Sequence, residues 1–570
     1  MKKMTELIES RLREAFSLAG LDESYGRVSL SNRPDLCEYQ CNGCLAAAKV
    51  LRKNPIELAG QVVSVLKNSS DFESVEAAAP GFINIKLSGE ALSFFVKQMA
   101  GEEKYGVETV SDPKTIIVDY GGANVAKPLH IGHLRSAIIG ESIKRLGAYL
   151  GNNMIGDVHL GDWGLQMGLI IENMPDGEIT IDQLEKIYPE ASARAKEDAE
   201  FAERAHQKTL LLQSGDPDCL AKWNRIMKVS LEDLKKNYDN LDVHFDLWNG
   251  ESTVNDLISP LIQKLIDNGI AYESDGALVV NVAEAEDKKE IPPCIVRKSD
   301  GAALYATSDL ATLEQREDLY KPDLYIYITD KRQAMHFVQV FRTARKASIV
   351  PDDRSLVHIG FGTMNGKDGK PFKTRAGGVM RLEELISDTQ EAVYRKIKEN
   401  RDISEDDARS IARTVALGAI KYGDLSNQAS KDYVFDLDRF TSFEGNTGPY
   451  ILYTIVRIKS IINRFNNEGS GTFSSEDIMP YTSESEKKLE LELIKYNEVI
   501  ENAWAELAPH KICQYIYSVA EAFNSFYHEV KILSEENEKL KKSYLAKISL
   551  TMKILLDCIY ILGFSAPDKM

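Results

Sequence analysis

The most constraining part of the chain is an apolar run followed by a glycine-containing turn and a helical pattern. Residues 115–118 (T-I-I-V) are β-branched and apolar, as is typical of a buried strand. Residues 134–149 repeat apolar side chains at helical spacing. The intervening residues 119–133 (D-Y-G-G-A-N-V-A-K-P-L-H-I-G-H) are therefore expected to form a turn that leads into a helix N-terminus. Backbone N–H groups and the helix dipole favour phosphate at such a position.

Two histidines flank a glycine at the end of this turn, in the order His130, Gly132, His133. A side chain at Gly132 would block any flat ring lying against the turn. Both imidazoles can donate hydrogen bonds to phosphate oxygens. The simpler alternative is a helix cap with two satisfied surface histidines, and the short motif alone leaves both interpretations open.

The composition is that of an ordinary globular protein of three or four domains, with 570 residues, 43% hydrophobic and 27% charged. The net charge of −18 argues against generic nucleic-acid binding, although it is compatible with a shaped RNA site that has local Lys and Arg. No apolar run approaches a membrane span, and residues 1–4 are not followed by the apolar region of a signal peptide. Seven scattered cysteines predict reduced thiols in the cytoplasm.

Residues 1–108 are expected to form a small α+β unit. Residues 81–87 (G-F-I-N-I-K-L) alternate apolar and polar side chains as a strand does. Cys41 and Cys44 are interpreted as buried helix residues, because a zinc site needs further ligands and no histidine precedes His130.

Residues 109–400 alternate strands and helices, which predicts a parallel sheet. The candidate strands are 116–119, 153–158, 324–329 and 357–361. Between about 170 and 300 the pattern becomes helical and charged, which indicates an insertion between two halves of the sheet. The charge run over 191–207 is interpreted as a solvated helix face.

Residues 401–570 are helical throughout, and a bundle of this size can bury its own core. The periodicity predicts helices over 408–422, 451–465, 485–507, 511–528 and 540–562.

Several longer motifs resemble those of one enzyme family. A class I aminoacyl-tRNA synthetase carries H-I-G-H at the first strand–helix turn of a Rossmann-like fold, as residues 130–133 do here. The wider stretches resemble arginyl-tRNA synthetases, and they fall in order along more than half of the chain: 124–130 (N-V-A-K-P-L-H), 161–166 (G-D-W-G-L-Q), 366–377 (G-K-D-G-K-P-F-K-T-R-A-G), 435–439 (F-D-L-D-R) and 443–450 (F-E-G-N-T-G-P-Y).

The resemblance implies an architecture for the whole chain. Residues 1–108 look like the family's additional, tRNA elbow-binding domain. Residues 109–400 look like its Rossmann-like catalytic domain, here with a helical insertion. Residues 401–570 look like its helical anticodon-binding domain.

The resemblance also implies an arginine–tRNA ligase that uses ATP with Mg²⁺ in two steps. The arginine carboxylate attacks the α-phosphate of ATP to give arginyl-adenylate, and the 2′-hydroxyl of the terminal tRNA adenosine then takes the arginyl group. A carboxylate is ionised at pH 7, so the first step needs charge stabilisation rather than a general base. Family positions identify His130, His133 and Lys127 for this role, with Gly132 leaving space for adenine.

A second phosphate-binding loop departs from the general class I pattern, K-M-S-K-S. The aligned residues are 371–375 (P-F-K-T-R), and Thr374 stands where the second lysine is usual. Arginyl-tRNA synthetases commonly lack that lysine, and an upstream lysine is thought to replace it. The candidates for contact with ATP or pyrophosphate are therefore Lys367, Lys370, Lys373 and Arg375; the alternative is a solvated basic loop.

A pocket selective for arginine needs carboxylates at both ends and a planar partner for the guanidinium. By resemblance, Asp119 and Asn124 hold the α-ammonium and carboxylate end of the substrate. Tyr305 and Asp309, four residues apart at a helix start, are the candidates for the guanidinium, together with Gln333. Many family members have Glu where this chain has Asp119.

For tRNA, the family reads the anticodon with its C-terminal helices. Tyr527 is the candidate for stacking an anticodon base, and a core aromatic residue is the alternative. At the tRNA elbow the candidates are Tyr39, Gln40 and Asn42. Four lysines are either phosphate contacts or solvated side chains: Lys541, Lys542, Lys547 and Lys553.

Three other functions stay open at this point. The first is another class I synthetase, such as the cysteinyl or glutamyl enzyme, although the cysteinyl enzyme needs a zinc-ligand set. The second is a small-molecule adenylating enzyme, which does not need the flanking domains. The third is an inactive RNA-binding paralogue, which has no need of His130, Gly132, His133, Tyr305 or Asp309. The expected partners are L-arginine, ATP and tRNA(Arg), bound by a cytoplasmic monomer without membrane attachment or structural zinc.

Overall fold

The computed structural model describes residues 1–299, 301–370, 380–400, 403–469 and 471–570. Its central element is a four-stranded parallel sheet with the strand order β11–β10–β5–β6. The strands are β5 (Thr115–Asp119), β6 (Asn153–Asp157), β10 (Leu324–Asp330) and β11 (Ser355–Phe361). All four predicted strands are confirmed. Because β6 and β10 lie on opposite sides of β5, the strand order changes direction at β5, which is where such sheets bind ligands.

The predicted strand–turn–helix unit is confirmed, since helix α5 (Ile131–Tyr149) follows the turn after β5. Ser136 attaches this helix to the sheet: its hydroxyl donates to the carbonyl of Ile328 (2.7 Å) and accepts from the N–H of Gly121 (2.9 Å). The helix also packs closely against the turn, because a Cβ at Gly140 would lie 2.2 Å from the ring of Tyr120. These contacts fix the helix N-terminus at the carboxyl edge of the sheet.

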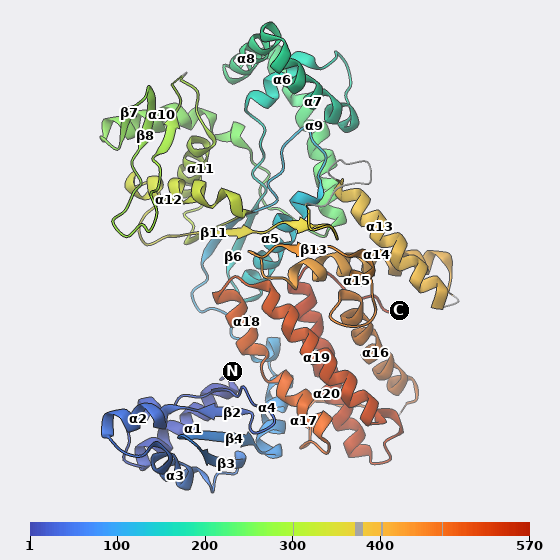
Figure 1. Cartoon of the computed structure of the whole chain (residues 1–570). Coiled ribbons are helices and arrows are strands. Elements are labelled where there is room, and N and C mark those ends of the chain that lie inside the picture. The colour runs from blue at the N-terminus through green and yellow to red at the C-terminus, as the bar shows by residue number, and fades with distance from the viewer. Residues whose placement is uncertain (300, 371–379, 401–402, 470) are drawn as a thin grey trace.

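The insertion between β6 and β10 forms two lobes (Figure 1). One lobe consists of α6 (Leu165–Asn173), α7 (Ile181–Glu197), α8 (Ala199–Gln213) and α9 (Pro217–Asn240). The other contains α10 (Asn255–Asp267), β7 (Ala271–Ser274), β8 (Ala277–Val280), β9 (Cys294–Arg297) and α11 (Tyr305–Leu319), with α12 (Ala334–Lys346) beside it. Strands β7, β8 and β9 form an antiparallel sheet that the helical pattern does not reveal, because each strand has only four residues.

The charge run over 191–207 belongs to two helices. Asp198 ends α7 and caps α8 by accepting a hydrogen bond from the N–H of Phe201 at 3.0 Å. Ala191, Phe201 and Ala205 are buried while most charged residues of the run are exposed. The solvated helix face is confirmed.

The C-terminal part is helical, as predicted, and lies below the sheet in Figure 1. It comprises α14 (Glu405–Leu425), α15 (Leu437–Phe440), α16 (Gly448–Asn467), α17 (Glu484–Leu493), α18 (Tyr496–Ala505), α19 (Pro509–Glu529) and α20 (Glu538–Ile561). Helix α13 (Leu382–Asn400), which precedes it, lies beside the sheet. The helix predicted over 485–507 is wrong, because α17 and α18 are separate helices. The apolar periodicity continues across the break and therefore does not mark it. Two short strands, β12 (Met364–Asn365) and β13 (Tyr433–Val434), pair in parallel beside the central sheet.

The N-terminal domain is an antiparallel sheet covered by helices. Its sheet has the order β1–β2–β4–β3. The elements are α1 (Met4–Leu18), β1 (Ser29–Leu30), β2 (Tyr39–Cys41), α2 (Gly43–Leu51), α3 (Pro55–Leu66), β3 (Phe72–Ala78), β4 (Phe82–Leu87) and α4 (Gly89–Gly101). The strand predicted over 81–87 is confirmed as β4. Cys41 and Cys44 are both buried, but Cys41 ends a strand instead of lying in a helix.

The N-terminal domain packs against the C-terminal helices and lies away from the central sheet (Figure 1). Lys487 of α17 forms ion pairs with Glu38 (2.9 Å) and Glu73 (2.8 Å) of this domain. The side-chain amide of Asn497 donates to the carbonyl of Gly106 at 2.8 Å. Within the described ranges, no helix is both long enough and apolar enough to cross a membrane.

Candidate active site

The two histidines of the turn cap the start of α5. His130 is the N-cap residue, and its Nδ1 accepts a hydrogen bond from the N–H of Gly132 at 3.0 Å. His133 Nδ1 accepts from the N–H of His130 at 3.2 Å, and the two ring centroids are 4.0 Å apart. Since both Nδ1 atoms accept, each neutral ring carries its hydrogen on Nε2. The capping interpretation is therefore correct, and it leaves both Nε2–H groups as donors.

The environment keeps both rings neutral. Burial lowers the pKa of His130, and the ammonium of Lys127 lowers it further. Burial and the neighbouring His130 lower the pKa of His133 to about 3. At pH 7 the turn therefore presents two neutral N–H donors beside the partial positive charge of a helix N-terminus.

The reason for a glycine at position 132 lies in the cap itself. A Cβ there would lie 2.7 Å from Cε1 and 2.8 Å from Nδ1 of His130. A side chain at Gly132 would thus displace the capping ring. Lys127 lies nearby, with its ammonium 4.1 Å from the ring centroid of Tyr188 in α7, and burial lowers its pKa.

The segment that carries the second predicted phosphate-binding loop ends beside this turn. After the loop, the N–H of Ile131 donates to the carbonyl of Met380 (3.1 Å) and the N–H of Leu382 donates to the carbonyl of Leu129 (2.9 Å). The chain therefore returns directly to the start of α5. The predicted residues Lys373, Thr374 and Arg375 lie outside the described residues.

The two earlier lysines of this loop are exposed. Lys367 Nζ lies 3.2 Å from Asp436 and 3.9 Å from Asp438, two residues of the 435–439 motif. Lys370 is exposed, and its backbone N–H donates to Asp368 at 3.1 Å. The structure thus gives the F-D-L-D-R motif a contact with the loop.

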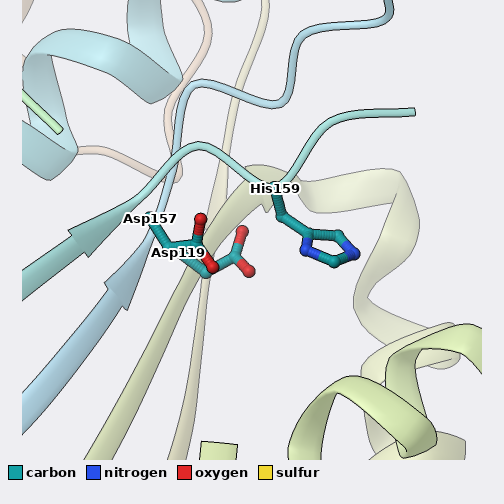
Figure 2. A group of neighbouring side chains, drawn as sticks. All are labelled: Asp119, Asp157 and His159. Atoms are coloured by element: carbon teal, nitrogen blue, oxygen red, sulfur yellow. The ribbon is translucent and has the colours of Figure 1, made fainter. Parts of the chain in front are cut away.

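Asp119 lies in a buried charge cluster at the carboxyl edge of the sheet (Figure 2). Asp119 ends β5 and Asp157 ends β6, at paired positions of adjacent parallel strands. Arg316 of α11 donates from Nη2 to both carboxylates, at 2.6 Å and 2.7 Å, and from Nη1 to the hydroxyl of Tyr327 at 2.9 Å. His159 lies beside them. Burial raises the pKa of Asp119, and the Arg316 guanidinium opposes that rise.

Asn124, the second residue predicted for this end of the substrate, is exposed on the turn. Its backbone pairs with Gly161, the first residue of the G-D-W-G-L-Q motif. A Cβ at Gly161 would lie 2.2 Å from Asn124 Oδ1. The glycine is therefore needed for the position of the Asn124 side chain.

The residues predicted for the guanidinium come from the starts of α11 and α12. Helix α11 begins at Tyr305, so that Tyr305 and Asp309 lie one turn apart as predicted, and the Tyr305 side chain is largely exposed. His336 Nε2 donates to Asp309 Oδ2 at 2.5 Å. Gln333 is exposed just before α12.

Glu251 is a candidate that the sequence did not indicate. Burial, together with the like charges of Asp162 and Asp309, raises its pKa to about 7. Glu251 follows a segment that pairs with the end of β6 and the residues just after it. In this pairing, the N–H of Leu160 donates to the carbonyl of Asn249 at 2.8 Å. No periodicity or motif predicts that pairing, which brings a second carboxylate to Asp309.

The tRNA candidates differ in exposure. Tyr527, 37% exposed, packs on Phe523, and the Arg457 guanidinium lies 5.1 Å from its ring centroid. Gln40 is partly exposed and bonded to Asn84, and Asn42 is exposed. Tyr39 is only 2% exposed, so its ring belongs to the core and the prediction of a tRNA contact is wrong.

One of the four candidate lysines for tRNA phosphates is also excluded by burial. Lys547 is fully buried and pairs with Glu486 and Glu490 of α17. It therefore stabilises the packing of α20 on α17 and cannot contact phosphate in this structure.

The whole chain is similar to known proteins in three consecutive parts. Residues 2–87 match the family described as "Arginyl tRNA synthetase N terminal domain", residues 96–437 match "tRNA synthetases class I (R), catalytic domain", and residues 451–570 match "DALR anticodon binding domain". The chain is 56% identical to the arginine–tRNA ligase of Agathobacter rectalis and 50% identical to that of Alkaliphilus oremlandii, with 100% of each chain covered.

A solved structure supports the same assignment. The arginyl-tRNA synthetase of Plasmodium falciparum superposes with a TM-score of 0.82 at 26% identity, covering 100% of both chains. Because the superposition covers both chains in full, it includes the parallel sheet and both flanking domains of this chain. The chain belongs to the arginyl-tRNA synthetase family of class I aminoacyl-tRNA synthetases.

Proposed function

We propose that this arginine–tRNA ligase charges tRNA(Arg) in two steps at the carboxyl edge of its parallel sheet. In the first step, a carboxylate oxygen of L-arginine forms a bond to the α-phosphorus of MgATP, and pyrophosphate leaves. In the second step, the 2′-hydroxyl of the terminal tRNA adenosine attacks the arginyl carbonyl carbon, and AMP leaves.

The arrangement of α11 carries the proposal. Asp309 and Arg316 are seven residues apart on one face of this helix, which corresponds to about 10 Å along its axis. Arg316 holds Asp119 at one end, while Glu251 adds its carboxylate to Asp309 at the other. An extended arginine fits between them with its ammonium at Asp119 and its guanidinium at Asp309. Tyr305 and Gln333 then complete the guanidinium end, and Asn124 the carboxylate end.

The histidine turn is proposed to bind the phosphates. The Nε2–H groups of His130 and His133 are proposed to donate to the phosphate oxygens as charge develops on them during attack, beside the positive end of the α5 dipole. Donation by neutral rings requires no change of protonation state. Lys127 adds positive charge there, and Lys367 and Lys370, with Lys373, Thr374 and Arg375, are proposed to reach the phosphates from the second loop.

Mg²⁺ is proposed to enter bound to ATP, as part of the substrate. Asp119, Asp157 and His159 offer ligand atoms within 4.8 Å of one another. Both carboxylates already accept from Arg316, and a guanidinium within hydrogen-bond distance repels a divalent cation. These residues therefore do not suit a resident magnesium ion.

For tRNA, we propose that residues 401–570 bind the anticodon and residues 1–108 the elbow, with residues 109–400, including an insertion at about 170–300, as the catalytic domain. Tyr527 with Arg457 is the proposed stacking surface, and Gln40 and Asn42 are the remaining elbow candidates. We also propose a cytoplasmic monomer. The seven cysteines, all buried and unpaired, suit a reducing compartment.

The test is ATP–pyrophosphate exchange with each proteinogenic amino acid, with and without tRNA, followed by transfer to tRNA. Only arginine is expected to support exchange. Transfer is expected to tRNA(Arg) ending in 3′-deoxyadenosine and not to tRNA(Arg) ending in 2′-deoxyadenosine. Exchange with another amino acid would contradict the pocket assignment, and transfer to the 2′-deoxy form would contradict the choice of hydroxyl.

A further inference from the structure

Asp157 and Arg316 are buried so completely that neither touches the substrate directly. The side chains of Asp157 and Arg316 are 1% and 2% exposed, whereas that of Asp119 is 15% exposed. Of the three charged groups, Asp119 is therefore the one that an incoming ligand reaches. The other two act on the ligand only through Asp119.

The hydrogen bonds of the cluster fix one oxygen of Asp119. Arg316 Nη2 bridges Oδ2 of Asp119 and Oδ2 of Asp157, and its Nη1 is held by the hydroxyl of Tyr327. The guanidinium contacts Asp119 through Oδ2 and leaves Oδ1 to other donors, and among the described residues the buried Oδ1 of Asp157 has no hydrogen-bond partner. The fixed carboxylate of Asp119 thus keeps one oxygen for a donor from outside the cluster.

The formal charges of Asp119, Asp157 and Arg316 are unbalanced, leaving aside the neighbouring imidazole of His159. Two carboxylates and one guanidinium leave a net charge of −1. A pair of Asp119 and Arg316 alone would be neutral and would attract a cation only weakly. Asp157 therefore supplies the charge that makes the site a receptor for an ammonium group, and Arg316 prevents two adjacent carboxylates from sharing a proton.

We propose that Asp157 and Arg316 are positioning residues for the α-ammonium group of the substrate arginine, acting through Asp119. Arg316 orients Asp119, and Asp157 provides the excess negative charge. This inference rests on the proposed function, in that it takes Asp119 as the contact for the ammonium. A planar guanidinium is needed because it donates to two carboxylates and a hydroxyl at once, which a single ammonium does not do in the same geometry.

The test compares arginine with 5-guanidinopentanoic acid, which is arginine without its α-amino group. Inhibition constants for the analogue and KM values for arginine are measured in tRNA charging. The amine preference is the inhibition constant of the analogue divided by KM for arginine. Because both ligands carry the guanidinium, this ratio reports the ammonium site separately from the guanidinium pocket. In Asp157→Asn the amine preference is expected to fall at least about tenfold, because one buried charge near the ammonium is lost. Binding of the analogue is expected to change by less than about threefold.

Tyr327→Phe and Asp309→Asn are the controls. Tyr327→Phe alters the same buried cluster without changing its charge, so the amine preference should be kept. If it falls as far as in Asp157→Asn, or if Asp157→Asn weakens both ligands equally, Asp157 has only a structural role and the inference is wrong. Asp309→Asn should weaken both ligands equally. If it changes neither ligand while Asp157→Asn still lowers the preference, the guanidinium assignment of the proposed function fails and the inference stands.

A second variant covers the case in which Asp157→Asn does not fold. Arg316→Lys keeps the charge but loses the simultaneous contacts with both carboxylates and Tyr327. A folded Arg316→Lys enzyme, checked by its melting temperature, is expected to lose amine preference by about threefold or more, since Asp119 is no longer fixed. An unchanged preference in that enzyme would remove Arg316 from the proposal.

Discussion

His336 donates a hydrogen bond from Nε2 to Oδ2 of Asp309, at 2.5 Å, and so orients the carboxylate that is proposed to bind the substrate guanidinium. The first prediction follows from this contact. In Asp309→Asn the charge opposite the guanidinium is removed, and truncating one partner of a desolvated charge pair typically costs about 2–5 kcal/mol. KM for arginine should rise and kcat/KM should fall, with KM for ATP unchanged. Steady-state charging measures all three.

A change of less than about threefold in both arginine parameters corresponds to under ~1 kcal/mol and would show that Asp309 does not bind the guanidinium. The matched control is Asp318→Asn on the same helix, α11, outside the proposed pocket. It should leave all three parameters as in the wild type.

The second prediction concerns pH. The pKa of Glu251 is raised to about 7, so the free protein keeps this group protonated below that pH. The guanidinium of arginine favours the ionised form, and binding is therefore expected to release a proton. Arginine affinity should rise as the pH increases through about 7 and become constant above it. Calorimetry in two buffers of different ionisation enthalpy measures the proton release, which Glu251→Gln should abolish.

The raised pKa of Glu251 also determines how the free energy of unfolding changes with pH. Between pH ~4.3, the ordinary value for Glu, and about 7, the folded state binds a proton that the unfolded state has lost. The free energy of unfolding therefore falls across this window as the pH rises. If calorimetry shows equal proton release on arginine binding for the wild type and Glu251→Gln, the pH dependence of arginine binding belongs to another group.

The parts of the fold that the sequence predicted are those with local signals. The central strands β5 and β10 are largely apolar runs because both of their faces are buried, and the turn before α5 has its own motif. The break between α17 and α18 has no such signal, since it lies within an unbroken apolar pattern. The small sheet of the insertion is too short to give one.

In the candidate site, too, only the residues that belong to a local motif could be predicted. The positions with a family motif, such as His130 and Asp309, could be named in advance. Glu251, Asp157 and Arg316 could not, because their roles depend on which segments pair at the sheet edge. The prediction that Lys547 lies on the surface was wrong for the same reason, because its two carboxylate partners lie on another helix.

The third prediction concerns anticodon binding. The ring of Tyr527 is partly exposed beside Arg457, and base stacking on an aromatic ring is typically worth about 1–3 kcal/mol. Tyr527→Ala is therefore expected to raise KM for tRNA(Arg) with little change in the melting temperature. Phe523 lies in the core beneath it, so Phe523→Ala should lower the melting temperature instead. If Tyr527→Ala charges tRNA with an unchanged KM, the stacking role is wrong.

The fourth prediction is that arginine activation depends on tRNA. The second loop has Thr374 where the general class I pattern has its second lysine, and the described cations of the loop are either exposed, as Lys370 is, or paired, as Lys367 is with Asp436. The second loop then offers the phosphates no fixed countercharge until tRNA binds. ATP–pyrophosphate exchange with arginine should need added tRNA(Arg), and robust exchange without it would contradict the prediction.

The last prediction separates the two roles that His130 combines. His130→Ala removes both the cap acceptor and the Nε2–H donor. Loss of the cap should cost about 0.5–2 kcal/mol of stability, and loss of the donor should lower the rate of adenylate formation by about 10²–10³. His130→Asn is the matched variant, because asparagine is a good N-cap residue but offers no imidazole donor. Its melting temperature should return toward that of the wild type while single-turnover adenylate formation stays slow and arginine binding is unchanged. A normal single-turnover rate in His130→Asn would show that the imidazole only caps the helix.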